Sequence, residues 1–518
     1  MSDSKRFFYP IAASILVIIG MMMGYFLQPN IDSKRASKFE EVLNALDREY
    51  VDSIDKNKMF DAAINDMLHK LDPHSRYISA KNLRQETEAM QGSFGGIGVR
   101  FQIINDTICV IKAIDGAPAY RAGVRSGDQI IAINGKPFTG KKATNDKVMS
   151  NLKGEPDTEV QVTILRNKKQ KKITINRGEI PLETVSVYYM LNETTGLIRI
   201  DQFSVLTYDE FITAAQSLIG KGMKSLVLDL RNNPGGVMDA AINVADEFLV
   251  SGDKIVSTKS KRYKNDVVKA QAGGILEKTK LVVLIDENSA SASEILAGAI
   301  QDNDRGLLVG RRTYGKGLVQ QDQILNDGSS VRMTISRYYT PSGRSIQRPY
   351  SGNYEEYMRD ESRYIRGEFF HEDSIPIDRK LVYKTKRGNK VYGGGGIVPN
   401  VFIPLDTSGA SIYLVELNAQ QVISAFVFKS LQQNRTKWKS IETLCNHNFS
   451  IYEIQDFTSF AQRIYKLDGY SLLSQKQKDR ISEQIKIEFG QQLWGELGAF
   501  RVITKNDSML IKALALLR

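Results

Sequence analysis

The pattern of apolar and polar positions divides the chain into stretches with different periods. Between residues 37 and 70, apolar side chains recur every three to four positions, which predicts a pair of helices. The proline turn LDPHS, residues 71–75, ends this pair. We interpret His74 in that turn as structural, and a catalytic role for it is the alternative.

A β-rich stretch occupies residues 94–180, where short runs such as GVRFQII and EVQVTILR alternate with glycine turns. This spacing predicts one compact β-rich module. From about residue 184, predicted strands alternate with predicted helices, and the strands SLVLDL and LVVLID are almost wholly apolar. Apolar strands of this kind are typical of a sheet that is covered on both faces. The second stretch therefore predicts an α/β architecture with crossover connections.

Two further segments have other patterns. Residues 350–380 are polar and aromatic without a clear period, which predicts an excursion on the surface. From about residue 411 to the end, the apolar positions return to a helical period, and this predicts a C-terminal helical extension.

Length and charge limit the classes of function. At about 150 residues per domain, 518 residues suggest about three or four domains. The net charge is +11, and the densest basic cluster is RNKKQKK, residues 166–172, between two predicted strands. A lysine-rich hairpin tip explains that cluster better than a nucleic-acid site, because lysines at sheet edges also oppose aggregation. We expect no nucleic-acid partner.

Cysteine and histidine are scarce. Cys109 and Cys445 lie far apart in the sequence, so a disulfide framework is not indicated, and the chain has no C-x-x-C pair for a zinc site. Only four histidines occur. We therefore expect no metal and no cofactor.

The N-terminus carries a long apolar segment. Residues 7–29 contain no charged side chain, and Lys5 and Arg6 precede them. A segment of this length can span about 30 Å of hydrocarbon as a helix, and the preceding basic pair favours a cytoplasmic N-terminus. A cleaved signal peptide is the alternative. We expect an anchor in the inner (cytoplasmic) membrane, with everything after Asp32 on the extracytoplasmic, periplasmic side.

The most informative motif is the serine-rich turn NSASASEILAGAIQ, residues 288–301. Ser291 and Glu294 have the spacing of a helix capping box, which alone could explain the serine. The same position also suits a nucleophile, because a helix N-terminus has unpaired N–H groups and partial positive charge that stabilise an oxyanion. The turn therefore predicts either a structural cap or a catalytic serine.

A glycine-framed lysine favours the catalytic interpretation. Lys316 lies between Gly315 and Gly317, and these glycines allow tight packing that could bring the amine into a dry site. Desolvation lowers the pKa of a lysine from about 10.4 by up to about 3–5 units, so that a neutral amine becomes available as a base. Gln320 can accept a hydrogen bond from this amine without holding it charged. A solvated lysine in a loop is the alternative.

Two glycine turns complete the candidate chemistry. Gly235 and Gly236 in DLRNNPGG follow a predicted buried strand, and their N–H groups could form an oxyanion hole with that of Ala292. A plain strand-to-helix turn is the alternative. The second turn opens the β-rich module, and its successive N–H groups could bind an anion or make an ordinary turn. Its residues are Phe94, Gly95, Gly96, Ile97 and Gly98.

Taken together, these motifs resemble those of the C-terminal processing peptidases, also called tail-specific proteases. The resemblance covers residues 39–404, and its motifs occur in the family's order: LDPHS, FGGIGV, APAYRAGVRSGDQIIAING, DLRNNPGG, NSASASEILAGAIQDN, RTYGKGLVQ, YYTPSGRSIQ and YGGGGIVPN. The conjunction is specific, although each motif alone is weak or moderate.

The resemblance implies a multidomain α/β protein with a PDZ domain and a crotonase-like protease core. It implies that Ser291 is the nucleophile, that Lys316 is the general base and that Gln320 orients the lysine. It also implies that the 94–98 loop binds the carboxylate of a substrate's C-terminus by strand addition, with Ile97 near the terminal side chain. The helical tail after residue 411 and the uncleaved anchor depart from the minimal family pattern.

These inferences predict five segments: an anchor or signal over residues 1–31, a helical segment over 32–83, a PDZ domain over 84–180, a protease core over 181–408 and a helical extension over 409–518. We expect a membrane-anchored serine endopeptidase that cleaves cell-envelope proteins with exposed apolar C-termini. The alternatives are an inactive PDZ scaffold and a hydrolase with a histidine base. Either helical end could also mediate a homodimer or bind an adaptor protein.

Overall fold

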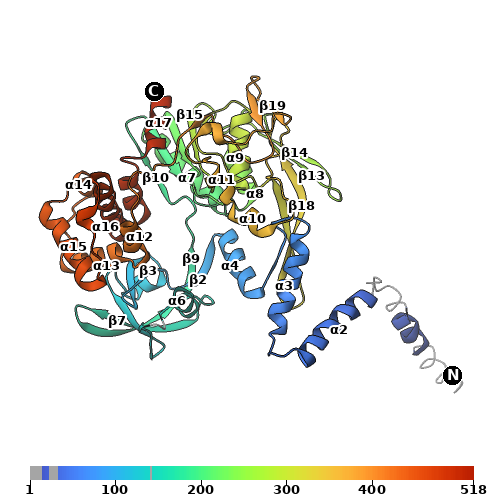
Figure 1. The fold of residues 1–518 in the computed structure, drawn as a ribbon, viewed down its shortest axis with the longest axis horizontal. Coiled ribbons are helices and arrows are strands. Elements are labelled where there is room, and N and C mark those ends of the chain that lie inside the picture. The colour runs from blue at the N-terminus through green and yellow to red at the C-terminus, as the bar shows by residue number, and fades with distance from the viewer. Residues whose placement is uncertain (1–13, 23–32, 141–142) are drawn as a thin grey trace, which may run out of the picture. The chain divides into compact units, whose positions relative to one another are not determined.

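The computed structural model describes residues 14–22, 33–140 and 143–518. The chain divides into two compact units, residues 1–71 and 72–518. Figure 1 shows the helices and strands with the labels that are used below.

The first unit is helical, as its periodicity predicts. It contains α2 (Ser33–Glu49) and α3 (Lys56–His69). The rings of Phe39 and Phe60 pack against each other with centroids 5.7 Å apart, which joins the two helices through their apolar positions. The carboxylate of Asp55 accepts a hydrogen bond from the backbone N–H of Lys58 and so caps α3.

The predicted membrane anchor is corrected by the structure. Residues 14–22 are helical, whereas residues 7–13 and 23–29 of the predicted anchor lie outside the described residues. Within the described ranges, no helix combines the length and the apolar character that crossing a bilayer requires. On this finding, the predicted location in the cytoplasmic membrane is wrong.

The β-rich module begins the second unit. Its main sheet has the order β3-β4-β5-β7-β8, with β6 paired to β5, and α6 packs on one face through Val148 and Leu152. The lysine-rich cluster lies at the tip of the β7–β8 hairpin, where Asn167 and Lys168 both have positive φ. The elements are β2 (Ser93–Gly96), β3 (Val99–Ile104), β4 (Thr107–Ala113), α5 (Pro118–Arg121), β5 (Gln129–Ile133), β6 (Lys136–Pro137), α6 (Asn145–Leu152), β7 (Glu159–Arg166), β8 (Lys169–Asn176) and β9 (Gly178–Pro181).

The α/β part is built on a six-stranded sheet of order β10-β11-β12-β15-β16-β21, in which all pairs except β10–β11 are parallel. The helices α7, α8 and α9 bury one face of this sheet. The elements are β10 (Val187–Met190), β11 (Thr195–Arg199), α7 (Thr207–Gly220), β12 (Ser225–Asp229), α8 (Met238–Asp246), β15 (Lys280–Ile285), α9 (Ala292–Asp302), β16 (Leu307–Gly310) and β21 (Val401–Phe402). The predicted alternation of strands and helices is confirmed.

A second sheet and a helical brace lie beside this core. The sheet has the order β1-β18-β13-β14, with β17 also paired to β18. The segment predicted as a surface excursion contains two short helices, and Tyr357, Arg363 and Glu368 in it are buried. The elements are β1 (Arg76–Ile78), α4 (Ala80–Gln91), β13 (Lys254–Lys259), β14 (Asp266–Lys269), β17 (Leu318–Ile324), β18 (Ser330–Tyr339), α10 (Tyr354–Arg359), α11 (Glu361–Ile365), β19 (Val382–Lys384) and β20 (Lys390–Tyr392).

The C-terminal extension is helical and packs on two parts of the second unit. Its first helices share a core with Ile104, Cys109 and Ile111 of the β-rich module, beside which they lie in Figure 1. Its last helix, α17, covers the second face of the six-stranded sheet. The elements are α12 (Ile412–Ala419), α13 (Val422–Gln433), α14 (Ile441–Asn446), α15 (Ile451–Tyr465), α16 (Gln475–Ile503) and α17 (Ser508–Leu517).

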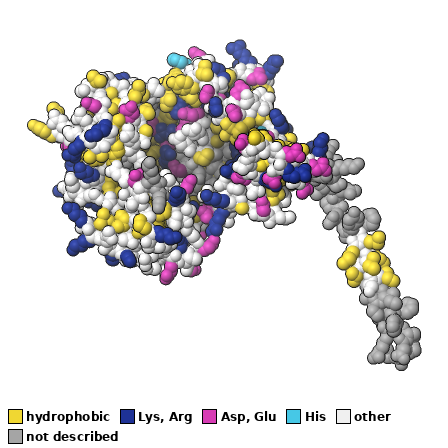
Figure 2. Space-filling model, turned by 60° about the horizontal axis from the view of Figure 1, so that its bottom comes forward, with side chains coloured by type: hydrophobic (Ala, Val, Ile, Leu, Met, Phe, Trp, Pro, Cys, Tyr) yellow, Lys and Arg dark blue, Asp and Glu magenta, His cyan; other side chains and the backbone are white. Residues whose placement is uncertain are grey.

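Basic side chains are dispersed over the surface. On the face drawn in Figure 2, Lys and Arg side chains are interspersed with acidic ones and form no single large patch. Nucleic-acid binding requires clustered positive charge. The excess of 11 positive charges therefore does not by itself indicate such binding.

Candidate active site

Ser291 lies at the carboxyl edge of the parallel sheet. The strand β15 ends at Ile285, a short turn follows, and α9 starts at Ala292. Ser291 is the N-cap of this helix, but its φ of 54° and ψ of −111° differ from the extended conformation of ordinary caps. Positive φ is costly for a residue with a Cβ atom and persists where the surroundings enforce it, often at functional sites. The turn therefore does more than cap the helix: it holds one serine in a strained conformation.

The Gly235–Gly236 turn packs directly against this serine. A Cβ atom on Gly235 would lie 2.8 Å from Ser291 Cβ, and one on Gly236 would lie 2.0 Å from the Phe203 carbonyl oxygen. Both glycines have positive φ, 98° and 137°. The two turns predicted at separate strand ends therefore meet, and only glycine fits at the contact.

The backbone donors of these turns differ in their availability. The N–H of Gly235 donates to the side-chain oxygen of Asn233 at 2.9 Å. Among the described residues, the N–H groups of Gly236 and Ala292 have no acceptor. Of the three predicted oxyanion donors, Gly236 and Ala292 are therefore free to bind a substrate oxygen, whereas Gly235 supplies the close packing.

Lys316 lies in the loop between β16 and β17 and lines the same cleft as Ser291. Burial is the main cause that lowers its pKa to about 8, and the positive charges of Arg332 and Arg76 lower it further. The carboxylates of Glu294 and Asp72 act in the opposite direction but do not cancel these effects. A substantial fraction of this amine is neutral near physiological pH, as a general base requires.

A buried carboxylate joins the two segments. Glu294 Oε2 accepts the backbone N–H of Ser291 at 2.8 Å and that of Lys316 at 2.9 Å. Its other oxygen accepts the Thr313 hydroxyl at 2.6 Å and the Gly315 N–H at 2.8 Å. The capping-box glutamate predicted from the sequence therefore also holds the lysine loop, and the Ser291 and Lys316 backbones lie side by side.

Gln320 lines this cleft too, and the LDPHS turn orients its side chain. The amide nitrogen of Gln320 donates to the His74 carbonyl at 2.6 Å, which leaves the amide oxygen as an acceptor for a lysine amine. The His74 ring instead contacts the Tyr357 hydroxyl at 3.1 Å. Burial, followed by the nearby Lys316 charge, lowers the pKa of His74 to about 3, so this ring is neutral at physiological pH.

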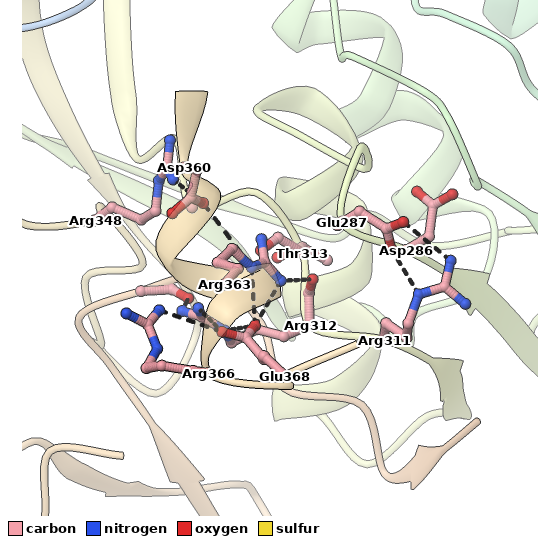
Figure 3. A network of polar contacts seen from close by, with 12 residues as sticks. Asp286, Glu287, Arg311, Arg312, Thr313, Arg348, Asp360, Arg363, Arg366 and Glu368 are labelled. Carbon is pink, nitrogen blue, oxygen red and sulfur yellow. Dashed lines mark hydrogen bonds and ion pairs between the residues drawn. The ribbon is translucent and has the colours of Figure 1, made fainter. Parts of the chain in front are cut away.

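A buried polar network holds Arg312 and Thr313, which precede Lys316 in its loop (Figure 3). The Arg363 guanidinium donates to the carbonyls of Arg312 and Thr313 at 2.7 and 3.2 Å. Glu368 pairs with Arg312 through two bonds of 2.7 Å and accepts a bond from Arg363. Each partner satisfies the charge of another, as buried ions require. The segment of residues 354–368 is therefore a brace for the loop.

The brace continues on both sides of Lys316. The Arg348 guanidinium lies over the rings of Tyr314 and Tyr357, 4.3 and 4.2 Å from their centroids. On the other side, the Gly317 N–H donates to the Gln347 side-chain oxygen at 2.8 Å. The loop is thus held at several successive residues, and the amine is positioned by a rigid frame.

The cleft itself has a volume of about 570 Å³ and a mixed lining. Apolar side chains line the cleft together with Ser291: Met90, Val237, Met238, Ile295 and Leu318. Arg332, also in the lining, pairs with both Glu86 and Asp322. The lining therefore combines apolar side chains with paired charges.

The predicted carboxylate-binding loop lies apart from this cleft, in the β-rich module. Phe94 is half-buried beneath the Lys153 amine, and Gly98 has a φ of 74°. Ile97 is only 2% exposed and packs in the core of the module. The strand β3, which follows the loop, is at the edge of its sheet and pairs only with β4 there.

Two supports of the site were not predicted from the sequence. Glu294 was predicted only as a capping residue, and residues 350–380, which include Arg363 and Glu368, were predicted to lie on the surface. For Glu294, the sequence contains a signal: a charged residue in the first turn of an otherwise apolar helix indicates a buried carboxylate with a structural role. Arg312 and Glu368 are 56 positions apart, and Glu368 lies in a segment without a clear period, so no local pattern predicts their pairing.

Comparison with known proteins identifies the family of the chain. The model of peptidase family S41 matches residues 194–352, and the PDZ domain model matches residues 95–176. A carboxy-terminal-processing protease of Bartonella bacilliformis is 37% identical over 320 residues, which is 61% of this chain and 73% of that protein. A probable CtpA-like serine protease of Staphylococcus aureus is 35% identical over 319 residues, 61% of this chain and 63% of that protein.

Similar solved structures include the photosystem II D1 C-terminal processing protease, which is 26% identical to this chain. The match covers 71% of this chain and 92% of that chain, with a TM-score of 0.36. The PDZ domain of a carboxy-terminal protease from Vibrio cholerae, in complex with peptide, is 26% identical, covers 17% of this chain and 99% of that chain, and has a TM-score of 0.16. The family matches and the 73% coverage of the Bartonella protein lead to one conclusion: this chain belongs to the carboxy-terminal-processing proteases of peptidase family S41.

Proposed function

We propose that this protein is a serine endopeptidase that binds apolar C-terminal tails on its PDZ domain and cleaves its substrates with a Ser291–Lys316 dyad. The observation that carries the proposal is the shared cleft, in which the strained Ser291 and a lysine with a pKa of about 8 lie on adjacent backbones. The proposal includes a crotonase-like fold for the protease core.

The proposed reaction has two steps. The Ser291 hydroxyl attacks a peptide carbonyl while neutral Lys316 takes its proton, and the N–H groups of Gly236 and Ala292 bind the oxyanion. Lys316 then gives this proton to the departing amine, which leaves an acyl-enzyme. In the second step water attacks the ester, Lys316 accepts a proton from the water, and the proton returns to the Ser291 oxygen as the acid product leaves. Gln320 orients the amine throughout.

Tail recognition is assigned to the PDZ domain. Within the part of the chain that the structure describes, the edge strand β3 pairs only with β4, so a peptide strand could be added at its other edge. Residues 94–98, of which 94–96 belong to β2, precede β3 and are proposed to bind the terminal carboxylate. We define the substrates by their apolar C-terminal tail alone. The cell-envelope substrates expected from the sequence are not proposed, because they depended on the predicted membrane location, which is wrong. The formation of a homodimer and the binding of an adaptor protein, both expected from the sequence, stay predictions.

The geometry disfavours the histidine-base alternative. His74 contacts Tyr357, and its pKa of about 3 makes it a weak base for a serine hydroxyl. The inactive-scaffold alternative is a matter for direct measurement.

The test uses an unfolded carrier protein in two forms, one ending in four apolar residues (the apolar-tail substrate) and one ending in four aspartates (the acidic-tail substrate). Wild-type protein should cleave the first faster than the second, and Ser291→Ala and Lys316→Ala should each abolish cleavage. Mass spectrometry of the products locates the cut. Equal, residual cleavage by all three proteins would support the inactive scaffold instead.

A further inference from the structure

Tyr338, the penultimate residue of β18, lies between the two segments of the proposed dyad. It is 1% exposed, and its hydroxyl oxygen is 3.0 Å from the Ser291 carbonyl oxygen and 2.5 Å from that of Lys316. Its backbone N–H also donates to the Gly317 carbonyl at 3.0 Å. One residue therefore contacts both segments, which are 25 positions apart in the sequence.

The hydroxyl has one proton for two carbonyls, so the surroundings decide how that proton is shared. The Ser291 carbonyl already accepts the N–H groups of Glu294 and Ile295, at 2.9 and 3.0 Å. Among the described residues, the Lys316 carbonyl has no other donor. The Tyr338 hydroxyl therefore donates mainly to the Lys316 carbonyl oxygen, while its oxygen stays in contact with the Ser291 carbonyl oxygen.

The hydroxyl remains a donor under all assay conditions. Burial raises the pKa of Tyr338 well above its usual value, and the nearby Glu294 carboxylate raises it further. Ionisation would place a second negative charge beside that carboxylate in a dry environment. The contact between Tyr338 and the two carbonyls therefore does not change with pH.

Tyr338 complements Glu294. The carboxylate of Glu294 accepts the N–H groups of Ser291 and Lys316, whereas the hydroxyl of Tyr338 contacts their carbonyls. Other groups hold the rest of the loop, but Glu294 and Tyr338 each contact both the Ser291 and the Lys316 backbone. Tyr338 therefore adds a second direct link between these two residues, made through their carbonyls.

We propose that Tyr338 is a positioning residue that sets the spacing between Ser291 and Lys316 by contacting both carbonyls, an inference that rests on the proposed Ser–Lys function. Without the hydroxyl, the lysine loop loses its donor and can move away from the serine, and water then reaches the amine. A displacement of about 1 Å between reacting groups can lower the rate by about 10²-fold. A more hydrated amine also regains part of its ordinary pKa.

Tyr338→Phe removes only the hydroxyl and keeps the ring that fills the site. With the apolar-tail substrate, kcat should fall by about 10- to 100-fold, while KM should change less than about twofold because the substrate contacts remain. The acidic limb of the kcat profile should also move to higher pH. Tyr339→Phe is the matched control, because its half-buried ring contacts Lys259 and its hydroxyl has no bond among the described residues.

A rescue experiment separates positioning from folding. Incorporation of 4-aminophenylalanine at position 338 restores a donor in place of the hydroxyl, and it should recover most of kcat and return the acidic limb toward that of wild type. Thermal unfolding of every variant is measured in parallel. A loss of kcat that follows the loss of thermal stability, with an unchanged pH profile and no rescue, would show that Tyr338 only supports the fold.

The outcomes are distinguishable. If the wild type has no cleavage that depends on Ser291, both the proposed function and this inference fail. If the wild type cleaves and Tyr338→Phe keeps its kcat and its pH profile, the positioning role of Tyr338 is overturned and the Ser–Lys function stands.

Discussion

The Ser291 turn and the Lys316 loop lie in the same cleft but are built by different means. The serine turn connects a buried parallel strand to an apolar helix; its Glu294 cap is local, whereas the Gly235–Gly236 turn packs against it from another strand end. The lysine loop has little regular structure and is held by distant polar groups, among them Glu294, Arg363 and Gln347. In the proposed pair, one member therefore has a local cap, and the other depends almost wholly on tertiary contacts.

The largest expected effect falls on the serine turn. In Gly235→Ala, the new Cβ would lie 2.8 Å from Ser291 Cβ at a φ of 98°, so the turn and the nucleophile must shift. We expect kcat/KM on the apolar-tail substrate to fall by at least about 10³-fold, since the loss of one oxyanion donor alone costs about 10²–10³-fold.

Gly252→Ala is the matched control for that change. Gly252 has a φ of 89°, and a Cβ atom there would meet nothing within 4 Å. The control should lose about 1 kcal/mol of stability and retain full activity. Normal activity of Gly235→Ala would show that the two turns do not meet as described.

The second effect concerns only the lysine loop, because its amine titrates and the serine turn does not. A neutral amine is required, and burial lowers the pKa of Lys316 to about 8. Activity should therefore rise about tenfold per pH unit below pH 8 and level off above it. The measurement is kcat/KM against pH with a substrate that has no titrating groups between pH 6 and 9. A profile that falls over this range would contradict a lysine base.

The third effect tests the brace. Glu368→Gln replaces a buried carboxylate that pairs with Arg312 and Arg363, which removes the ion pair of Arg312 and leaves Arg363 only its longer pair with Asp360, at 3.9 Å. Breaking a buried ion pair in this way costs about 3–5 kcal/mol. We expect a lower melting temperature and a roughly tenfold loss of kcat, because the loop that carries Lys316 becomes mobile.

Arg359→Gln is the control for the brace. Arg359 lies on α10 in the same segment, and it forms an exposed pair with Glu355 at 3.9 Å. Exposed pairs contribute at most about 1 kcal/mol, so stability and kcat should be nearly unchanged. If both variants behave alike, the segment does not support the loop through its buried charges.

The smallest effect is expected at His74. Gln320 is oriented by the His74 backbone carbonyl, which His74→Asn retains, whereas the His74 ring contacts the side chains of Tyr357 and Tyr314. Turnover should change by less than about threefold, and the pH profile should keep its position near pH 8. A loss of activity with intact folding would instead support a histidine base.

Local patterns in the sequence were sufficient to predict the strands and helices of the α/β part, the β-rich module, the helical extension and the meeting of candidate turns at a sheet edge. They predicted the capping box of Ser291 and Glu294 because the motif spans four residues. The predicted location in the cytoplasmic membrane was the main error, because no helix within the described residues is long and apolar enough to cross a bilayer.

The tertiary structure decided the rest. Only the fold shows that Glu294 also holds Lys316, that Tyr338 contacts both Ser291 and Lys316, that Glu368 braces Arg312, and that α17 covers the second face of the core sheet. These contacts join residues that are tens to hundreds of positions apart, so no periodic pattern marks them. The sequence by itself predicted which groups would carry the proposed chemistry; their spacing and the dry surroundings that lower the pKa of the lysine depend on how distant segments pack.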